Sequence, residues 1–98
     1  MSRDEILQQL NAKRSKLSAL HVKTLAVFGS VARGDARADS DVDIVVEFEG
    51  PVRFDRYMAL KVFLEDTVGR PVDLLTRPGI RPELAPSIEQ EAVYVTTG

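Results

Sequence analysis

The amino-acid sequence predicts an α/β fold of the α+β type, in which a small mixed β-sheet of three to four strands packs with about four helices. Two observations support this prediction. Stretches whose apolar residues recur every three or four positions alternate along the chain with short, strongly apolar stretches. The length of 98 residues gives room for one modest core, so residues 1–98 are expected to form a single domain.

The first two predicted elements are a helix over residues 2–20 and a strand over residues 25–28. In the helical stretch, isoleucine and leucine residues recur at helical spacing, and Ser2 followed by Glu5 matches a capping box. Residues 25–28 are uniformly apolar, which favours a strand in the interior of the sheet over one at its edge.

A turn at Gly29 and Ser30 closes this strand. Residues 31–34 are expected to form one helical turn with Ser30 as its N-cap, and a loop with mixed charges follows up to position 40. The next apolar stretch predicts a second strand over residues 42–48.

The second half of the chain predicts another helix and another strand. A helix is expected over residues 53–68, because most of its apolar residues fall on one side, and Gly69 suits the position just after its end. Residues 71–76 form the third predicted strand. Its side chains alternate between two faces, with Val72 and Leu74 on one and Asp73 and Leu75 on the other.

The last part of the chain predicts a turn at residues 78–79, a helix over residues 82–92 and a short fourth strand over residues 92–95. Pro86 limits the regularity of that helix. Three of its side chains are expected to face inward, Leu84, Ile88 and Ala92.

Composition excludes several classes of protein. A hydrophobic content of 44% and a charged content of 29% are typical of a soluble globular protein, and the net charge of −2 argues against direct nucleic-acid binding. The absence of cysteine excludes disulfides and thiolate zinc sites. No apolar run approaches the length of a membrane span or of a signal peptide core, so a cytoplasmic protein without a membrane partner is expected.

Three aspartates stand out within or beside the predicted strands. Ten residues separate Ser30 from Asp41, and Asp43 follows two positions later, so the two carboxylates project to the same side. Asp43 and Asp73 lie inside apolar strands, where a carboxylate is unfavourable unless something pairs with it. If the second and third strands are neighbours, all three carboxylates converge on one face.

Three converging carboxylates suit divalent metal ions. Two Mg²⁺ or Mn²⁺ ions bound by Asp41, Asp43 and Asp73 would match the arrangement used for in-line displacement at phosphorus, with a nucleoside triphosphate as substrate. We expect one ion to polarise the attacking oxygen and the other to hold the triphosphate, with Asp73 accepting the proton of the attacking hydroxyl.

The turn after the first strand is expected to hold the phosphates of that nucleotide. Gly29 lets the backbone approach phosphate closely, and Ser30 offers a hydroxyl and a backbone N–H at a helix start. Arg33 and Arg37 lie within reach of the phosphate tail, where a guanidinium group is well matched, although arginines in a charged loop are often simply solvated.

Other interpretations of these residues are weaker. A calcium-binding EF-hand loop starting at Asp39 would need glycine where Ile44 stands and glutamate where Gly50 stands, and no Gly-Lys-Ser/Thr sequence follows Gly29 as a Walker A loop requires. A purely structural role is the remaining alternative, in which Asp41 caps a strand end and Asp43 pairs with an arginine.

The pattern of Gly-Ser, ten residues, Asp-x-Asp and a later aspartate resembles the nucleotidyltransferase superfamily of DNA polymerase β. The segments GSVARG at residues 29–34 and SDVD at residues 40–43 resemble its minimal members, the MNT proteins. The resemblance implies the nucleotidyltransferase fold. It implies that Asp41 and Asp43 bind both metals, that Asp73 completes the catalytic set, and that Gly29 and Ser30 hold the triphosphate. Arg33 and Ser40 are further candidates for nucleotide binding.

The resemblance also implies a partner. Minimal nucleotidyltransferases are typically paired with a HEPN ribonuclease toxin, and some of these antitoxins transfer AMP from ATP to a tyrosine hydroxyl of the toxin. Because 98 residues leave no space for an acceptor-binding domain, the acceptor is expected to come from another molecule. Two alternatives stay open: a binding module that neutralises its partner by contact alone, and a small-molecule nucleotidyltransferase of the aminoglycoside-modifying type that works with a partner subunit.

Overall fold

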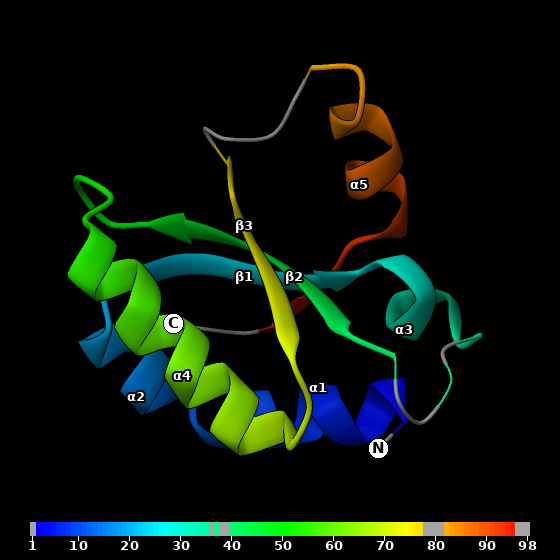
Figure 1. Ribbon diagram of the computed structural model, residues 1–98, viewed down its shortest axis with the longest axis horizontal. Helices are drawn as coiled ribbons and strands as arrows, with labels where there is room; N and C mark the ends of the chain where they lie inside the picture. The colour runs from blue at the N-terminus through cyan, green and yellow to red at the C-terminus, as the bar shows by residue number, and fades with distance from the viewer. Residues whose placement is uncertain (1, 36, 38–39, 78–81, 96–98) are drawn as a thin grey trace.

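The computed structural model of the protein describes residues 2–35, 37, 40–77 and 82–95. Its described strands form one sheet in the order β3-β2-β1-β4 (Figure 1). The strands are β1 (Val22–Phe28), β2 (Val42–Phe48), β3 (Val72–Thr76) and β4 (Val93–Val95). Strand β1 runs antiparallel to β2 and β4, whereas β2 and β3 are parallel. The predicted small mixed sheet is therefore confirmed.

Helices cover the two faces of the sheet unequally. One face packs against α1 (Arg3–Ala12), α2 (Arg14–Ala19) and α4 (Phe54–Val68), whereas the other carries α5 (Ala85–Glu91) alone near the short α3 (Gly29–Arg33) (Figure 1). The larger core includes the fully buried side chains Ile6, Leu10, Leu17, Leu25, Ile44, Leu60 and Leu64. Among the described residues, the second face holds a smaller buried cluster, Ala26, Val45 and Ile88. It is this second face that leaves room for polar side chains.

The parallel pairing of β2 and β3 follows from the crossover helix between them, because parallel neighbours need a long connection. Helix α4 begins after Arg53 and ends at Gly69, which adopts the left-handed conformation with φ of +69°. The prediction of a helix ending just before this glycine is confirmed. The hydroxyl of Tyr57 donates to the carbonyl of Leu74 at 2.7 Å and ties α4 to β3.

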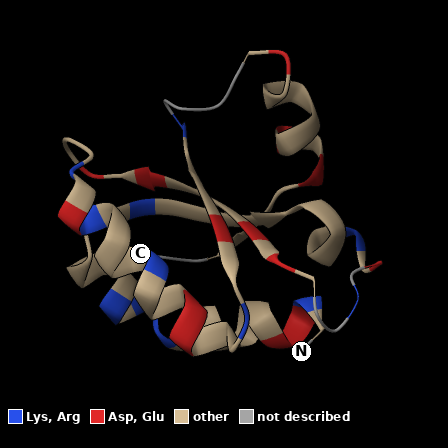
Figure 2. Cartoon of the chain, viewed as in Figure 1, with Lys and Arg blue, Asp and Glu red and all other residues tan. Residues whose placement is uncertain are grey.

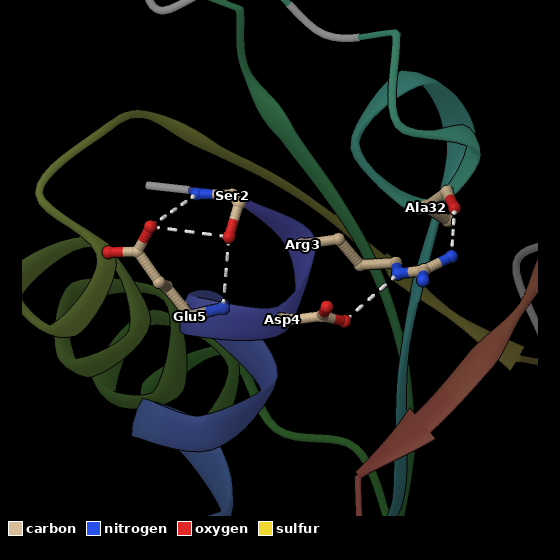
Figure 3. A network of polar contacts seen from close by, with 5 residues as sticks. All are labelled: Ser2, Arg3, Asp4, Glu5 and Ala32. Atoms are coloured by element: carbon tan, nitrogen blue, oxygen red, sulfur yellow. Dashed lines mark hydrogen bonds and ion pairs between the residues drawn. The ribbon is translucent and has the colours of Figure 1, made fainter.

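The single helix predicted over residues 2–20 is wrong, because the structure has two helices that meet at Lys13. Segment 11–16 contains one apolar residue, Ala12, so no core contact holds a continuous helix together there. The predicted start is correct. Ser2 Oγ accepts from the backbone N–H of Glu5 at 3.3 Å, and Glu5 Oε1 accepts from the N–H of Ser2 at 3.3 Å (Figure 3).

Replacing Ser2 with alanine is expected to lower the free energy of unfolding by about 1 kcal/mol, because the first turn of α1 loses its side-chain acceptor. Ser18→Ala, at an exposed position of α2, is the matched control and should change the stability far less. Urea denaturation measures both. Equal effects would contradict a specific capping role for Ser2.

Three further boundaries differ from the predictions. Strand β1 begins at Val22, before the predicted start at residue 25. The prediction missed these residues because a bulge near Thr24 interrupts the regular alternation of the strand. Helix α3 begins at Gly29, with Phe28 as its N-cap and no side-chain cap, so the N-cap role predicted for Ser30 is wrong. Helix α5 begins at Ala85 and not at residue 82 as predicted. This start places Pro86 in the first turn, where a helix tolerates proline.

The shorter α5 also changes the orientation predicted for one side chain. Ile88 is buried as predicted, but Leu84 lies in the turn before the helix and is 49% exposed. The turn predicted at residues 78–79 lies outside the described residues. Among the described helices, none is long and apolar enough to cross a membrane.

Candidate active site

Strand β1 runs directly into α3, and the junction lies against an aspartate. Gly29 is buried and has φ of +72°. A Cβ atom built on it would lie 2.2 Å from Asp43 Oδ2, well inside the limit of atomic contact. Only glycine satisfies both conditions, the left-handed backbone and the space. The predicted Gly-Ser turn therefore meets Asp43, the second aspartate of the predicted Asp-x-Asp pair.

The strand register brings two of the predicted aspartates, Asp43 and Asp73, to one face of the sheet. Asp43 pairs with Asp73 on the parallel strand β3 and with Phe28 at the end of β1. Val42 and Ile44 are buried on the face covered by α1, α2 and α4, so Asp43 projects from the opposite face. Figure 2 shows the acidic positions of β2 and β3 side by side. Asp43 is half-buried, whereas Asp41 and Asp73 are exposed.

The electrostatics of Asp43 reflect this gathering of negative charge. Burial raises the pKa of Asp43 above its ordinary value, and the neighbouring carboxylates of Asp73 and Asp41 raise it further. Arg33 opposes the rise in this pKa, whereas Glu91 of α5 adds to it. The charged form of Asp43 is therefore less favourable in this site than in water, and a bound cation would offset the difference.

Arg33 opposes the rise in the pKa of Asp43, and its guanidinium group already has two carboxylate partners. Its Nε donates to Asp35 Oδ2 at 3.3 Å and its Nη1 to Glu91 Oε1 at 3.0 Å. These partners, Asp35 first, raise the pKa of Arg33. Glu91 was missed by sequence reasoning, because 58 positions separate it from Arg33 and no local pattern links them.

Residues 5–95 match the family model of the nucleotidyltransferase domain. The chain belongs to this family. The protein adenylyltransferase MntA of Thermococcus cleftensis is 37% identical over 93 residues, which cover 94% of each chain. A solved structure described as a minimal nucleotidyltransferase is 36% identical and has a TM-score of 0.76, with 95% of both chains covered. The predicted nucleotidyltransferase fold and enzyme class are thus confirmed.

A more distant match shows the fold alone. It is a chain from the complex of a tri-AMPylated Shewanella oneidensis HEPN toxin with an MNT antitoxin. The identity is 20% and the TM-score 0.61, and the match covers 93% of this chain and 73% of the other.

Polar contacts hold Ser40 and the entrance of β2 in this nucleotidyltransferase. Ser40 Oγ accepts from the backbone N–H of Arg37 at 2.9 Å, and the Ser40 carbonyl accepts from Arg70 Nε at 3.1 Å. The N–H of Val42 donates to the carbonyl of Pro71 at 3.0 Å, which fixes the entrance of β2 beside that of β3. Arg70 was not predicted from the sequence. The nucleotide-binding roles of Ser40 and Arg37 stay predictions.

The helix that follows the Gly-Ser turn is held from two sides. Val31 and Ala32 are buried in the larger core, and the carbonyl of Ala32 accepts from Arg3 Nη1 of α1 at 3.1 Å (Figure 3). The N–H of Asp35 donates to the carbonyl of Ser30 at 3.1 Å. These contacts hold the backbone around Gly29 and Ser30 in place.

The chemistry of the three aspartates suits a divalent cation. Mg²⁺ and Mn²⁺ take oxygen ligands, and such an ion would relieve the repulsion that raises the pKa of Asp43. Within the described part of the chain, no three Asp, Glu, His or Cys side chains are already close enough together to enclose an ion. Asp41 and Asp73 are exposed, so they have room to rotate toward one.

Proposed function

We propose that this nucleotidyltransferase is the antitoxin of a toxin–antitoxin pair and transfers AMP from ATP to a tyrosine hydroxyl of a HEPN ribonuclease toxin. The observation that carries the proposal is the contact of the Gly29 backbone with Asp43, beside Asp73 on the same face of the sheet. The similarity to MntA of Thermococcus cleftensis supports the adenylyl group and a protein acceptor. The fold shared with a chain of the HEPN–MNT complex supports the kind of partner.

In this proposal the carboxylates of Asp41, Asp43 and Asp73 hold two divalent ions, Mg²⁺ or Mn²⁺, and Gly29 and Ser30 hold the triphosphate of ATP. The bound ions would neutralise charge on the triphosphate and favour ionisation of the acceptor hydroxyl. The backbone N–H groups of the tight turn can donate to phosphate oxygens, because glycine lets the phosphate come close.

The transfer joins the acceptor oxygen to the α-phosphorus of ATP and breaks the bond from that phosphorus to the leaving pyrophosphate. The hydroxyl proton passes to Asp73, which is exposed and therefore open to an acceptor on another molecule. Asp43, half-buried against Gly29, is the fixed carboxylate of the three. Two further residues, Arg33 and Ser40, would contact the nucleotide.

The test is transfer of label from [α-³²P]ATP in the presence of Mg²⁺ to a HEPN-domain protein of the same genome. The protein should label its partner on tyrosine, and the double variant Asp41→Asn with Asp43→Asn should reduce the label to background while keeping its circular dichroism spectrum. Label that survives the double change would refute the catalytic assignment. If the double variant still protects cells from the toxin, neutralisation occurs by contact and not by transfer.

A further inference from the structure

Glu91 stands at the end of α5 and reaches an arginine of the candidate active site. Its Oε1 accepts from Arg33 Nη1 at 3.0 Å, and both side chains are partly exposed, 32% for Glu91 and 48% for Arg33. The pair joins α5 to α3, on the face of the sheet that carries the aspartates. Glu91 is thus a fourth carboxylate at this site, and the proposed reaction gives it no role.

Glu91 brings a further negative charge to a site that already carries three carboxylates, and Arg33 is its partner there. Glu91 lies close enough to Asp43 to raise the pKa of that group, so it adds to the negative charge of the cluster. An exposed ion pair of this kind is weak and exchanges easily. A triphosphate offers the same arginine several charged oxygens and bidentate geometry, which make a stronger contact.

We propose that Glu91 occupies, on the guanidinium group of Arg33, the place that a phosphate oxygen of the nucleotide takes when it binds. The Glu91 carboxylate is therefore an internal competitor of the triphosphate, and removing its charge tightens nucleotide binding. This inference rests on the proposed role of Arg33 in holding the nucleotide. The alternative is that Glu91 positions Arg33 for the nucleotide, and this alternative predicts the opposite change in affinity.

The test compares the dissociation constant of a non-hydrolysable ATP analogue with Mg²⁺, measured by titration calorimetry, between the wild type and Glu91→Gln. We expect binding to become roughly fivefold tighter, the range of a weak ion pair. The effect of Glu91→Gln should disappear in a protein that also carries Arg33→Gln, because the guanidinium group for which Glu91 and the phosphate compete is then absent. Glu91→Ala is a second variant, because the side-chain amide oxygen of Glu91→Gln could still accept a hydrogen bond from Arg33.

Glu89→Gln is the matched control. Glu89 lies on the same helix, two positions away, and accepts from Arg77 and from the hydroxyl of Tyr94. This variant removes the same charge and also loosens α5, but it leaves the partners of Arg33 in place. Its affinity for the analogue should stay at the wild-type value.

Three results would overturn the inference: weaker binding by Glu91→Gln, unchanged binding by both Glu91 variants, or equal tightening by Glu89→Gln. Weaker binding would make Glu91 a positioning residue. A wild-type protein that binds no nucleotide would instead overturn the proposed function, and the inference with it. The two failures are therefore distinguishable in a single set of titrations.

Discussion

Gly29→Ala is expected to lower AMP transfer by at least about 100-fold, because displacement of a reacting group by about an ångström has an effect of this size. The new Cβ would lie 2.2 Å from Asp43 Oδ2, so either the carboxylate or the turn must move. Both belong to the proposed site. Gly29 has a left-handed backbone with φ of +72°, and an alanine in that conformation destabilises the folded variant by roughly 1–2 kcal/mol.

Gly34→Ala separates these two effects. Gly34 has φ of +82°, so an alanine there suffers the same backbone penalty, but its Cβ would meet nothing within 4 Å. We expect Gly34→Ala to lower the free energy of unfolding and to keep most of the transfer activity. Urea denaturation and the labelling assay, run on both variants, provide the comparison. Equal loss of activity in the two would show that the contact of Gly29 with Asp43 has no catalytic importance.

Asp43→Asn is expected to abolish transfer and yet to raise the melting temperature of the metal-free protein at neutral pH by a few degrees. Its pKa is raised from 3.8 by burial and by the carboxylates of Asp73 and Asp41. The folded protein therefore binds a proton at this group more tightly than the unfolded chain does. The free energy of unfolding must fall as the pH rises through the interval between the two pKa values.

Above that interval the charged carboxylate destabilises the wild type, and asparagine removes the charge. The variant should be more stable than the wild type at neutral pH. This difference should vanish below the ordinary pKa of 3.8, because Asp43 is then protonated in both the folded and the unfolded protein. Thermal melts in a chelator at several pH values measure this. Mg²⁺ should then raise the melting temperature of the wild type more than that of the variant.

Glu83→Gln, at an exposed position outside the cluster, is the control for simple loss of one negative charge. It should leave the melting temperature nearly unchanged at every pH. A destabilised Asp43→Asn protein at neutral pH would contradict the account of Asp43 as a carboxylate under repulsion.

Most of the fold could be predicted from local patterns. Residues 42–48 read as a strand because a continuous apolar run encloses Asp43, and the structure gives strand β2 the same bounds. Helix α4 could be read from its apolar side and from Gly69 at its end. The break at Lys13 and the start of α5 were missed. The break at Lys13 depends on whether a core packs against that segment. The start of α5 depends on the position of Pro86 in its first turn.

The residue types and the spacing of the candidate site can be predicted from the chain alone, because strand alternation places Asp41 and Asp43 on one side and glycine allows the turn at Gly29. The contact of Asp43 with Gly29 and its pairing with Asp73 arise only in the folded protein. The ion pair of Glu91 with Arg33 arises in the same way. Strand order, register and helix docking result from burying one shared core, and no local stretch of sequence encodes that burial.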